Sequence, residues 1–242
     1  MIMCKLMSAM TKPVIIFCIP GNSFSNRFLG SWTNLLGELG NKYTIMLSNR
    51  YSSQVNFARA MCLGASVLDG PDQKPFGNGK VKYDAIVWLD SDMVFDSKTV
   101  DRLIQGCLNT YPVYSGIYAM DGGHQLCCVE NWDEEYYKEH GTFEFLSVQE
   151  GAQRIAVQNP YVKAAYVGFG CLALRYGVIE HKDFKYPWFF KDITKFEKDG
   201  RIITDGTSED VSFIRNLIDN KIIDSVIVNL ELRFGHEKTI VY

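Results

Sequence analysis

Two runs of consecutive apolar residues constrain the fold of this chain more than any other feature. Residues 14–19 (VIIFCI) end at Pro20-Gly21, and residues 85–89 (AIVWL) end at an acidic triplet. A strand that is apolar at every position has to be covered on both faces, as the strands of parallel sheets are. The sequence therefore predicts an α/β fold built around a mostly parallel sheet.

Helical periodicity fills the intervals between the predicted strands. Apolar residues at positions 28–39 recur at helical spacing, and Gly40 follows as a stop signal. Further helices are predicted over about residues 54–67, 100–108 and 211–218, and further strands over residues 44–47, 113–118, 164–167, 171–174 and 226–228. Repeated strand–helix alternation in the first half predicts a doubly wound sheet, whose ligand sites lie beyond the carboxyl ends of its strands.

The 242 residues contain no internal repeat, so we predict a single domain over residues 1–242. Proline and glycine interrupt residues 70–80, which we expect to form a surface loop. Residues 121–159 are polar, rich in aromatic side chains and poorly periodic. Within them, residues 130–140 are compatible with either a helix or a lid.

Composition restricts the partners of the protein. A formal net charge of −3 argues against a general nucleic-acid binder, which would show a basic face. The seven cysteines include no CxxC pair, which favours a reducing, cytoplasmic environment. The apolar run at 14–19 is too short for a membrane span, so we expect a soluble protein without an integral membrane segment. His124, Cys127 and Cys128 have a poor spacing for zinc, and the rest of a ligand set is missing.

An acidic triplet, Asp90-Ser91-Asp92, directly follows the apolar run at 85–89. Two carboxylates at positions i and i+2 beyond a buried strand can turn toward one cavity and hold a hard divalent cation, Mn²⁺ or Mg²⁺. Such a cation completes its coordination shell with water and with substrate phosphates. The alternative interpretation is an ordinary solvated turn after a strand.

A second cluster, Thr207-Ser208-Glu209-Asp210, precedes a predicted helix. Thr207 or Ser208 can cap that helix, and the two acids then favour its positive N-terminal dipole. A carboxylate at this place can also act as a general base that takes a proton from a hydroxyl group. The sequence leaves both interpretations open.

Near the C terminus, His236 follows the last predicted strand. An isolated histidine is compatible with an ordinary surface role, and as a neutral imidazole it can also be a metal ligand. Lys238 is then placed to neutralise a phosphate group.

Together these motifs resemble the GT-A glycosyltransferases, particularly the family 2-like branch. The resemblance extends from about residue 14 to the C terminus. The motifs that carry it are Ile19-Pro20-Gly21, Asn56-x-x-Arg59, residues 87–92 (VWLDSD), 115–118 (SGIY), 167–171 (VGFGC) and 208–213 (SEDVSF), and Gly235-His236. It implies a Rossmann-like, mostly parallel sheet flanked by helices, with a smaller antiparallel portion on the acceptor side.

The resemblance also implies an activity. It implies a metal-dependent transfer of a sugar, with inversion of the anomeric centre, from a nucleoside diphosphate sugar to a hydroxyl of a carbohydrate, glycan or other acceptor. UDP is the favoured nucleotide. The nucleotide-sugar half would cover about residues 13–120, and the acceptor half would cover about residues 121–242. No general nucleic-acid partner is expected.

The residue roles that the resemblance implies fall into four groups. Donor-binding residues are Pro20, Gly21, Asn22, Arg59, Asp90, Ser91, Asp92 and Lys238. The metal ligands are Asp90, Asp92 and His236, with Asp92 the direct ligand. Asp210 is similar to the catalytic base of the inverting members. Acceptor-binding residues are Gly168, Phe169, Gly170 and Glu209. Apart from the resemblance, the aromatic segment at 183–190 offers Trp188 as a further acceptor-binding residue, which can stack on a sugar ring or simply pack in the core.

Two other functions are compatible with parts of this pattern. A sugar-nucleotide nucleotidyltransferase would need a glycine-rich phosphate loop with an arginine after the first strand, and residues 20–23 (PGNS) are not such a loop. A non-catalytic carbohydrate- or nucleotide-binding module is a further alternative. The joint presence of Asp92, Asp210 and His236 argues against it.

Overall fold

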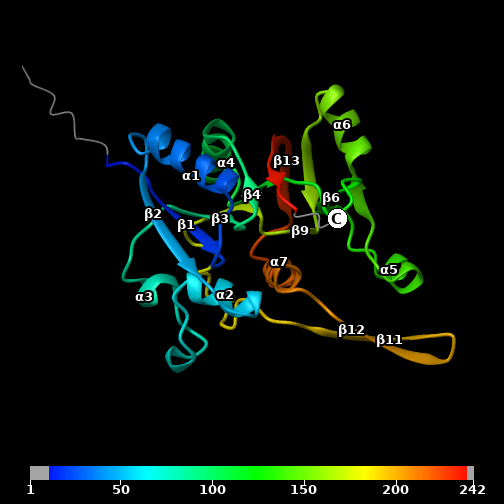
Figure 1. The fold of residues 1–242 in the computed structure, drawn as a ribbon. Coiled ribbons are helices and arrows are strands. Elements are labelled where there is room, and N and C mark those ends of the chain that lie inside the picture. Colours follow the sequence, from blue (N-terminus) through cyan, green and yellow to red (C-terminus); the bar gives the residue numbers. More distant parts are fainter. Residues whose placement is uncertain (1–10, 239–242) are drawn as a thin grey trace, which may run out of the picture.

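A computed structural model describes residues 11–238, and a seven-stranded sheet forms its centre (Figure 1). In spatial order the strands are β2 (Thr44–Arg50), β1 (Val14–Pro20), β3 (Ala85–Leu89), β10 (Cys171–Arg175), β5 (Val113–Ile117), β13 (Val226–Arg233) and β8 (Tyr161–Ala164). β1 pairs in parallel with β2 and β3, and β13 pairs in parallel with β5. β10 and β8 run opposite to their neighbours. The predicted α/β class with a mostly parallel sheet is confirmed.

The position of β10 differs from a simple doubly wound order. β10 comes from the second half of the chain and lies antiparallel between β3 and β5. Its apolar residues are buried on both faces, a pattern that does not reveal the neighbours of a strand. Cys171 pairs with Leu89, so the turn at residues 168–170 lies beside the carboxyl end of β3.

Two helical layers cover the central sheet (Figure 1). α1 (Asn26–Leu39) and α4 (Ser97–Asn109) pack on one face, where Phe28 and Leu103 join the core around β1 and β3. α2 (Val55–Cys62) and α7 (Glu209–Asp219) pack on the other face. α2 is shorter than the predicted helix over 54–67 because Gly64 adopts a left-handed backbone, with φ of +73°. Within residues 11–238, every helix is too short or too polar to cross a bilayer.

A smaller antiparallel sheet lies beside the central one, as expected for the second half of the chain. It contains β7 (Phe145–Ser147), β6 (Gln125–Val129) and β9 (Tyr166–Val167), and it is flanked by α5 (Glu134–His140) and α6 (Val148–Ala156). The C-terminal part of the segment at 130–140 is therefore helical. A separate hairpin, β11 (Ile193–Lys198) and β12 (Arg201–Gly206), projects from the body of the protein (Figure 1).

The remaining elements are short. They are η1 (Val67–Asp69), α3 (Pro75–Gly79), β4 (Met93–Val94) and β14 (Gly235–His236). α3 lies in the predicted loop at 70–80 and contains residues with positive φ, so it is a local turn of unusual handedness. β14 pairs antiparallel with β4, which places the end of the described chain against the segment that follows β3.

Candidate active site

A cavity of about 400 Å³ opens at the carboxyl ends of β1, β2 and β3. Its lining consists of Pro20, Gly21, Tyr51, Ser52, Val55, Ala58, Arg59, Asp90, Ser91, Asp92, His236 and Lys238. All predicted donor-binding residues except Asn22 contribute to this lining, and the Asn22 side chain is exposed outside it. The cavity therefore brings together residues from both ends of the chain.

Backbone geometry fixes the loop after β1 against the acidic triplet. Asn49 donates hydrogen bonds from its Nδ2 to the carbonyl oxygens of Ile19 and Gly21, at 2.6 and 2.8 Å. Gly21 has a φ of +146°, and a Cβ atom at this position would lie 2.7 Å from Ser91 Oγ. Glycine is required here because both the backbone conformation and the close approach exclude a side chain.

The C-terminal segment completes the cavity at Asp92. The Glu237 N–H donates to the Asp92 carbonyl at 2.8 Å, and His236 Nε2 lies 3.1 Å from Asp92 Oδ2. The other ring nitrogen of His236, Nδ1, lies 3.1 Å from the carbonyl oxygen of Ala119. A carbonyl only accepts, so Nδ1 carries a proton, and the ring is oriented with Nε2 toward Asp92. Lys238 Nζ lies 3.4 Å from the same carboxylate oxygen.

These groups have the chemistry of a partial cation site. Partial burial raises the pKa of Asp92, but the hydrogen bond from His236 and the charges of His236 and Lys238 outweigh it and lower the pKa, so Asp92 is ionised. Within residues 11–238, no three His, Cys, Asp or Glu side chains are grouped as a ready-made metal site. Both ring nitrogens of His236 face acceptors, and the hydrogen bond with Asp92 raises the pKa of His236, so Nε2 carries a proton while no cation is bound. A divalent cation would replace that proton, with Asp92 and His236 as protein ligands and water or a bound phosphate as the others.

Arg59 connects the acidic triplet to the start of α7. Its buried guanidinium binds Asp90 Oδ1 through Nη2 at 3.0 Å and Glu209 Oε1 through Nε at 2.9 Å. It also lies 4.9 Å above the centre of the Phe169 ring. Burial disfavours its charge, but Asp90 and Glu209 outweigh this effect and raise the pKa of Arg59. One oxygen of Asp90 is engaged by the buried Arg59, and the Asp90 side chain is 29% exposed against 42% for Asp92, so Asp92 is the more accessible carboxylate.

Three predicted acceptor residues lie in the interior, and their assignment needs correction. Trp188 and Phe169 are both 0% exposed and belong to the core between the sheet and α7. Glu209 is 5% exposed and is held by Arg59. None of these side chains is accessible to an acceptor, because each is covered by packing that a sequence pattern cannot show.

The two predicted acceptor glycines are also buried, and they serve a packing role. A Cβ at Gly168 would lie 2.1 Å from the Tyr118 hydroxyl oxygen, and one at Gly170 would lie 2.7 Å from Tyr118 Cε1. These glycines make room for the Tyr118 ring beside the turn. They do not present a surface to an acceptor.

Asp210 is held by two hydroxyl groups. Tyr166 donates its hydroxyl to Asp210 Oδ2 at 2.9 Å, and Ser208 donates to Asp210 Oδ1. Ser208 precedes α7 but makes no capping hydrogen bond with its side chain, so the capping interpretation does not describe this serine. Burial and the charge of Glu209 raise the pKa of Asp210, while Ser208, Arg59 and Tyr166 partly oppose the rise.

Some lining and supporting residues were absent from the sequence prediction. Tyr51 and Ser52 follow β2, whose end is adjacent to that of β1, so the strand-end rule offered a signal for them. Tyr166 had no such signal, because its contact with Asp210 joins β9 to α7 across 44 residues.

Comparisons with known proteins identify similar folds. No protein-family model matches the chain, and no curated protein does. A solved structure described as A197 from STIV aligns with a TM-score of 0.50 and 16% identity, over 94% of this chain and 86% of that one. Glucosyl-3-phosphoglycerate synthase from Mycobacterium tuberculosis, in complex with Mn²⁺, UDP-glucose and phosphoglyceric acid, aligns with a TM-score of 0.45 and 13% identity, over 95% and 73%. At such identity, the likeness to A197 concerns the fold alone.

Proposed function

We propose that this protein is a metal-dependent glycosyltransferase of the GT-A type. It moves a sugar from a nucleoside diphosphate sugar, with UDP as the favoured nucleotide, to an acceptor hydroxyl. The observation that carries the proposal is the convergence of Asp92, His236 and Lys238 in a cavity that Arg59 links to the pair Glu209-Asp210. A cation site and a candidate base thus belong to one connected arrangement.

The donor side provides charge and shape for a nucleoside diphosphate. Asp92 and His236 would hold Mn²⁺ or Mg²⁺, which when bound neutralises charge on a diphosphate leaving group. Lys238 adds a positive charge beside the same carboxylate. Tyr51, which is 55% exposed and lines the cavity, offers an aromatic face to a nucleobase.

On the acceptor side, Asp210 would act as the general base. Its raised pKa makes the carboxylate a better proton acceptor than an ordinary aspartate, and Tyr166 and Ser208 fix its orientation. A base that removes the proton from an attacking hydroxyl supports direct displacement at the anomeric carbon. We therefore propose that the transfer inverts the anomeric configuration.

We expect Mn²⁺ to strengthen UDP binding to the wild-type protein. Asp92→Ala should abolish this dependence on Mn²⁺, because the mutation removes the principal carboxylate ligand. Isothermal titration calorimetry with Mn²⁺ and with a chelator measures the effect. Asp121→Ala is a matched control, because Asp121 also contacts Lys238, at 3.5 Å, but does not line the cavity. Equal wild-type affinities with Mn²⁺ and with chelator would refute the cation-bridged donor site.

The pH dependence of turnover tests the environment of Asp210. The Tyr166 hydrogen bond stabilises the carboxylate and so lowers the pKa of Asp210. Because catalysis needs the deprotonated base, Tyr166→Phe should move the acidic limb of the kcat profile to higher pH. Tyr176→Phe, at an exposed tyrosine, should leave the limb in place. A limb that stays in place in Tyr166→Phe would show that Asp210 does not control it.

A further inference from the structure

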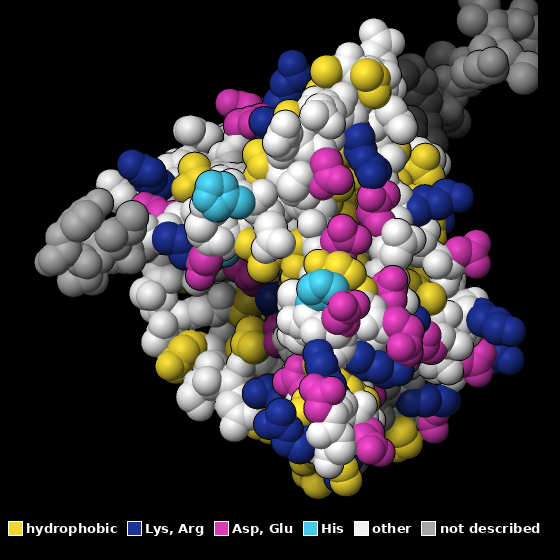
Figure 2. Space-filling view, turned by 90° about the vertical axis from the view of Figure 1, so that its right-hand side faces the viewer, with side chains coloured by type: hydrophobic (Ala, Val, Ile, Leu, Met, Phe, Trp, Pro, Cys, Tyr) yellow, Lys and Arg dark blue, Asp and Glu magenta, His cyan; other side chains and the backbone are white. Residues whose placement is uncertain are grey.

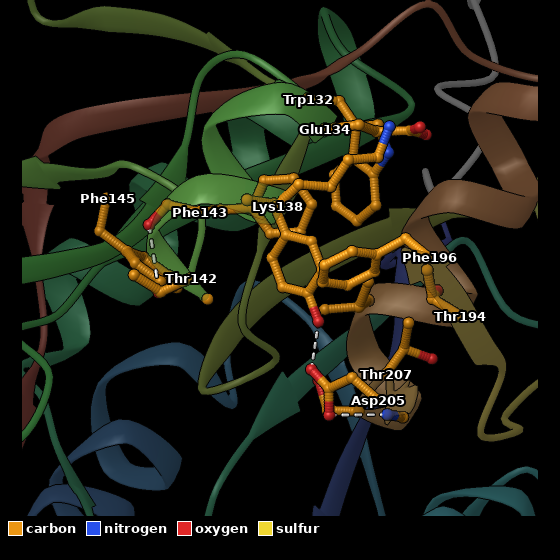
Figure 3. A pocket seen from close by; sticks show the side chains of 15 residues that line it. Trp132, Glu134, Lys138, Thr142, Phe143, Phe145, Thr194, Phe196, Asp205 and Thr207 are labelled. Atoms are coloured by element: carbon orange, nitrogen blue, oxygen red, sulfur yellow. Dashed lines mark hydrogen bonds between the residues drawn. The ribbon is translucent and has the colours of Figure 1, made fainter. Parts of the chain in front are cut away.

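A second cavity, of about 230 Å³, lies between α5 and the β11–β12 hairpin (Figure 3). Five aromatic side chains contribute to its wall: Trp132, Tyr137, Phe143, Phe145 and Phe196. All five are half-buried, which distinguishes them from the fully enclosed aromatic residues of the core. The cavity therefore offers aromatic surface that remains accessible to a ligand.

Segments from two parts of the chain build this aromatic wall. The Trp132 and Phe143 rings stack with their centroids 4.0 Å apart, and Tyr137 stacks on Phe143 at 4.9 Å. The Arg215 guanidinium lies 4.6 Å from the centre of the Trp132 ring, so the faces of Trp132 are partly covered and its remaining surface borders the cavity. Phe196 comes from the hairpin and meets Tyr137 edge-on, with ring centroids 5.8 Å apart. Lys198 anchors the hairpin to α5, because its Nζ donates to the backbone carbonyl oxygen of Glu139 at 2.6 Å. The hairpin is therefore held beside α5 by this hydrogen bond and by the contact between Phe196 and Tyr137.

The cavity adjoins the proposed base. Ser208 lines the cavity, and its hydroxyl donates to Asp210 Oδ1. Phe145 also lines the cavity and packs edge-on against Tyr166, which donates to Asp210 Oδ2. Both carboxylate oxygens of Asp210 are thus held by groups in or directly behind the cavity wall.

Polar groups in the lining favour a neutral, hydroxyl-rich ligand. Thr142, Thr194 and Thr207 contribute hydroxyl groups, which suit the hydroxyls of a sugar, while the aromatic faces suit its C–H surfaces. The charged side chains of the lining are Lys138, Glu134 and Asp205. Lys138 is paired with Glu135 at 2.7 Å, and Asp205 accepts a hydrogen bond from the Tyr137 hydroxyl. Acidic and basic side chains are interspersed on this side of the molecule (Figure 2), so it is not a strongly basic surface for an anionic ligand.

The two adjoining cavities have room for one sugar ring each. The cavity is smaller than the roughly 300–1,000 Å³ typical of sites for drug-sized ligands, which suits a single ring. A neighbouring cavity of about 380 Å³ shares Trp132, Glu134, Thr194, Thr207 and Val211 with it. A second ring can therefore lie on the other side of the shared wall.

We propose that these adjoining cavities bind a neutral oligosaccharide, with one ring packed against Trp132 and Phe196 and the next ring in the neighbouring cavity. The identification of this oligosaccharide as the acceptor rests on the proposed glycosyltransferase function. The binding of the sugar does not depend on donor binding, so the two proposals can fail separately.

Binding of maltose, cellobiose and lactose to the full-length protein tests the proposal, with glucose 6-phosphate and glucuronate as anionic probes. We expect at least one disaccharide to bind, and we expect Trp132→Ala and Phe196→Ala to weaken its binding about tenfold through loss of aromatic contact. Trp132→Phe keeps a flat ring and should retain most of the affinity. Ile202→Ala is the matched control, because Ile202 lies on the same hairpin, is 77% exposed and is not in the lining.

Calorimetry with the disaccharides and, separately, with UDP and Mn²⁺ distinguishes the possible outcomes. Disaccharide binding that is lost in Trp132→Ala and restored in Trp132→Phe, with UDP affinity unchanged, supports the proposal. Absence of disaccharide binding at millimolar concentration, wild-type affinity in both alanine variants, or tighter binding of the anionic probes overturns it. If a disaccharide binds while UDP does not, the glycosyltransferase proposal fails and the oligosaccharide site stands.

Discussion

We expect Asp210→Asn to lower kcat by roughly 10²–10⁴-fold while the affinity for UDP with Mn²⁺ stays nearly unchanged. Asparagine has the size of aspartate and keeps an oxygen that can accept from Tyr166 or Ser208, but it cannot take up a proton from an attacking hydroxyl. The loss should therefore fall on the chemical step. Initial rates of UDP release, together with calorimetry of UDP binding, separate the two quantities.

Asp224→Asn provides a control just beyond the same helix, since Asp224 is exposed and lines neither the donor cavity nor the two cavities proposed for the oligosaccharide. Its turnover should match that of the wild type. An unchanged kcat in Asp210→Asn would remove Asp210 from the role of base. In the wild-type reaction, NMR of the anomeric centre should show an inverted product, and a retained configuration would contradict direct displacement by a base-activated hydroxyl.

The second large effect concerns stability. We expect Arg59→Ala to lower the free energy of unfolding by about 3–5 kcal/mol, because it leaves the buried carboxylate of Glu209 without its partner. Asp90 loses the same partner, so the acidic triplet should also become less well positioned. Urea unfolding followed by circular dichroism measures the change in stability.

Two further variants show whether the loss comes from an unpaired buried charge. Arg59→Ala combined with Glu209→Ala should be less destabilising than the sum of the single changes, because the uncompensated carboxylate is gone. Arg102→Ala removes one partner of the exposed pair with Glu231 and should cost no more than about 1 kcal/mol. A similarly small cost for Arg59→Ala would contradict the buried-pair explanation.

The sequence was sufficient to predict the elements that surround the donor cavity. β1 and β3 were recognised because apolar residues at every position require cover on both faces, which is a local property. The strand-end rule then directed attention to Asp90 and Asp92, and the family resemblance added Pro20 and Gly21; the structure places all four in one cavity. Their roles in binding a donor and a cation remain predictions.

Burial decided which of the remaining candidates face a ligand. Trp188 and Trp132 are both aromatic residues in sequence segments without clear periodicity, yet Trp188 is fully enclosed and Trp132 lines a cavity. The hairpin that carries Phe196 was not predicted, because its strands are largely exposed and lack the alternation produced by a buried face. Acceptor contacts therefore could not be located from residue type alone.

The sequence by itself determined the α/β class, the main buried strands and the acidic triplet at the end of β3, because these depend on local hydrophobic patterns. Only the tertiary structure decided that Arg59 joins Asp90 to Glu209 and that His236 meets Asp92. These contacts join residues up to 150 positions apart, and they depend on how strands and helices from both halves of the chain pack. Local periodicity contains no information about such pairings.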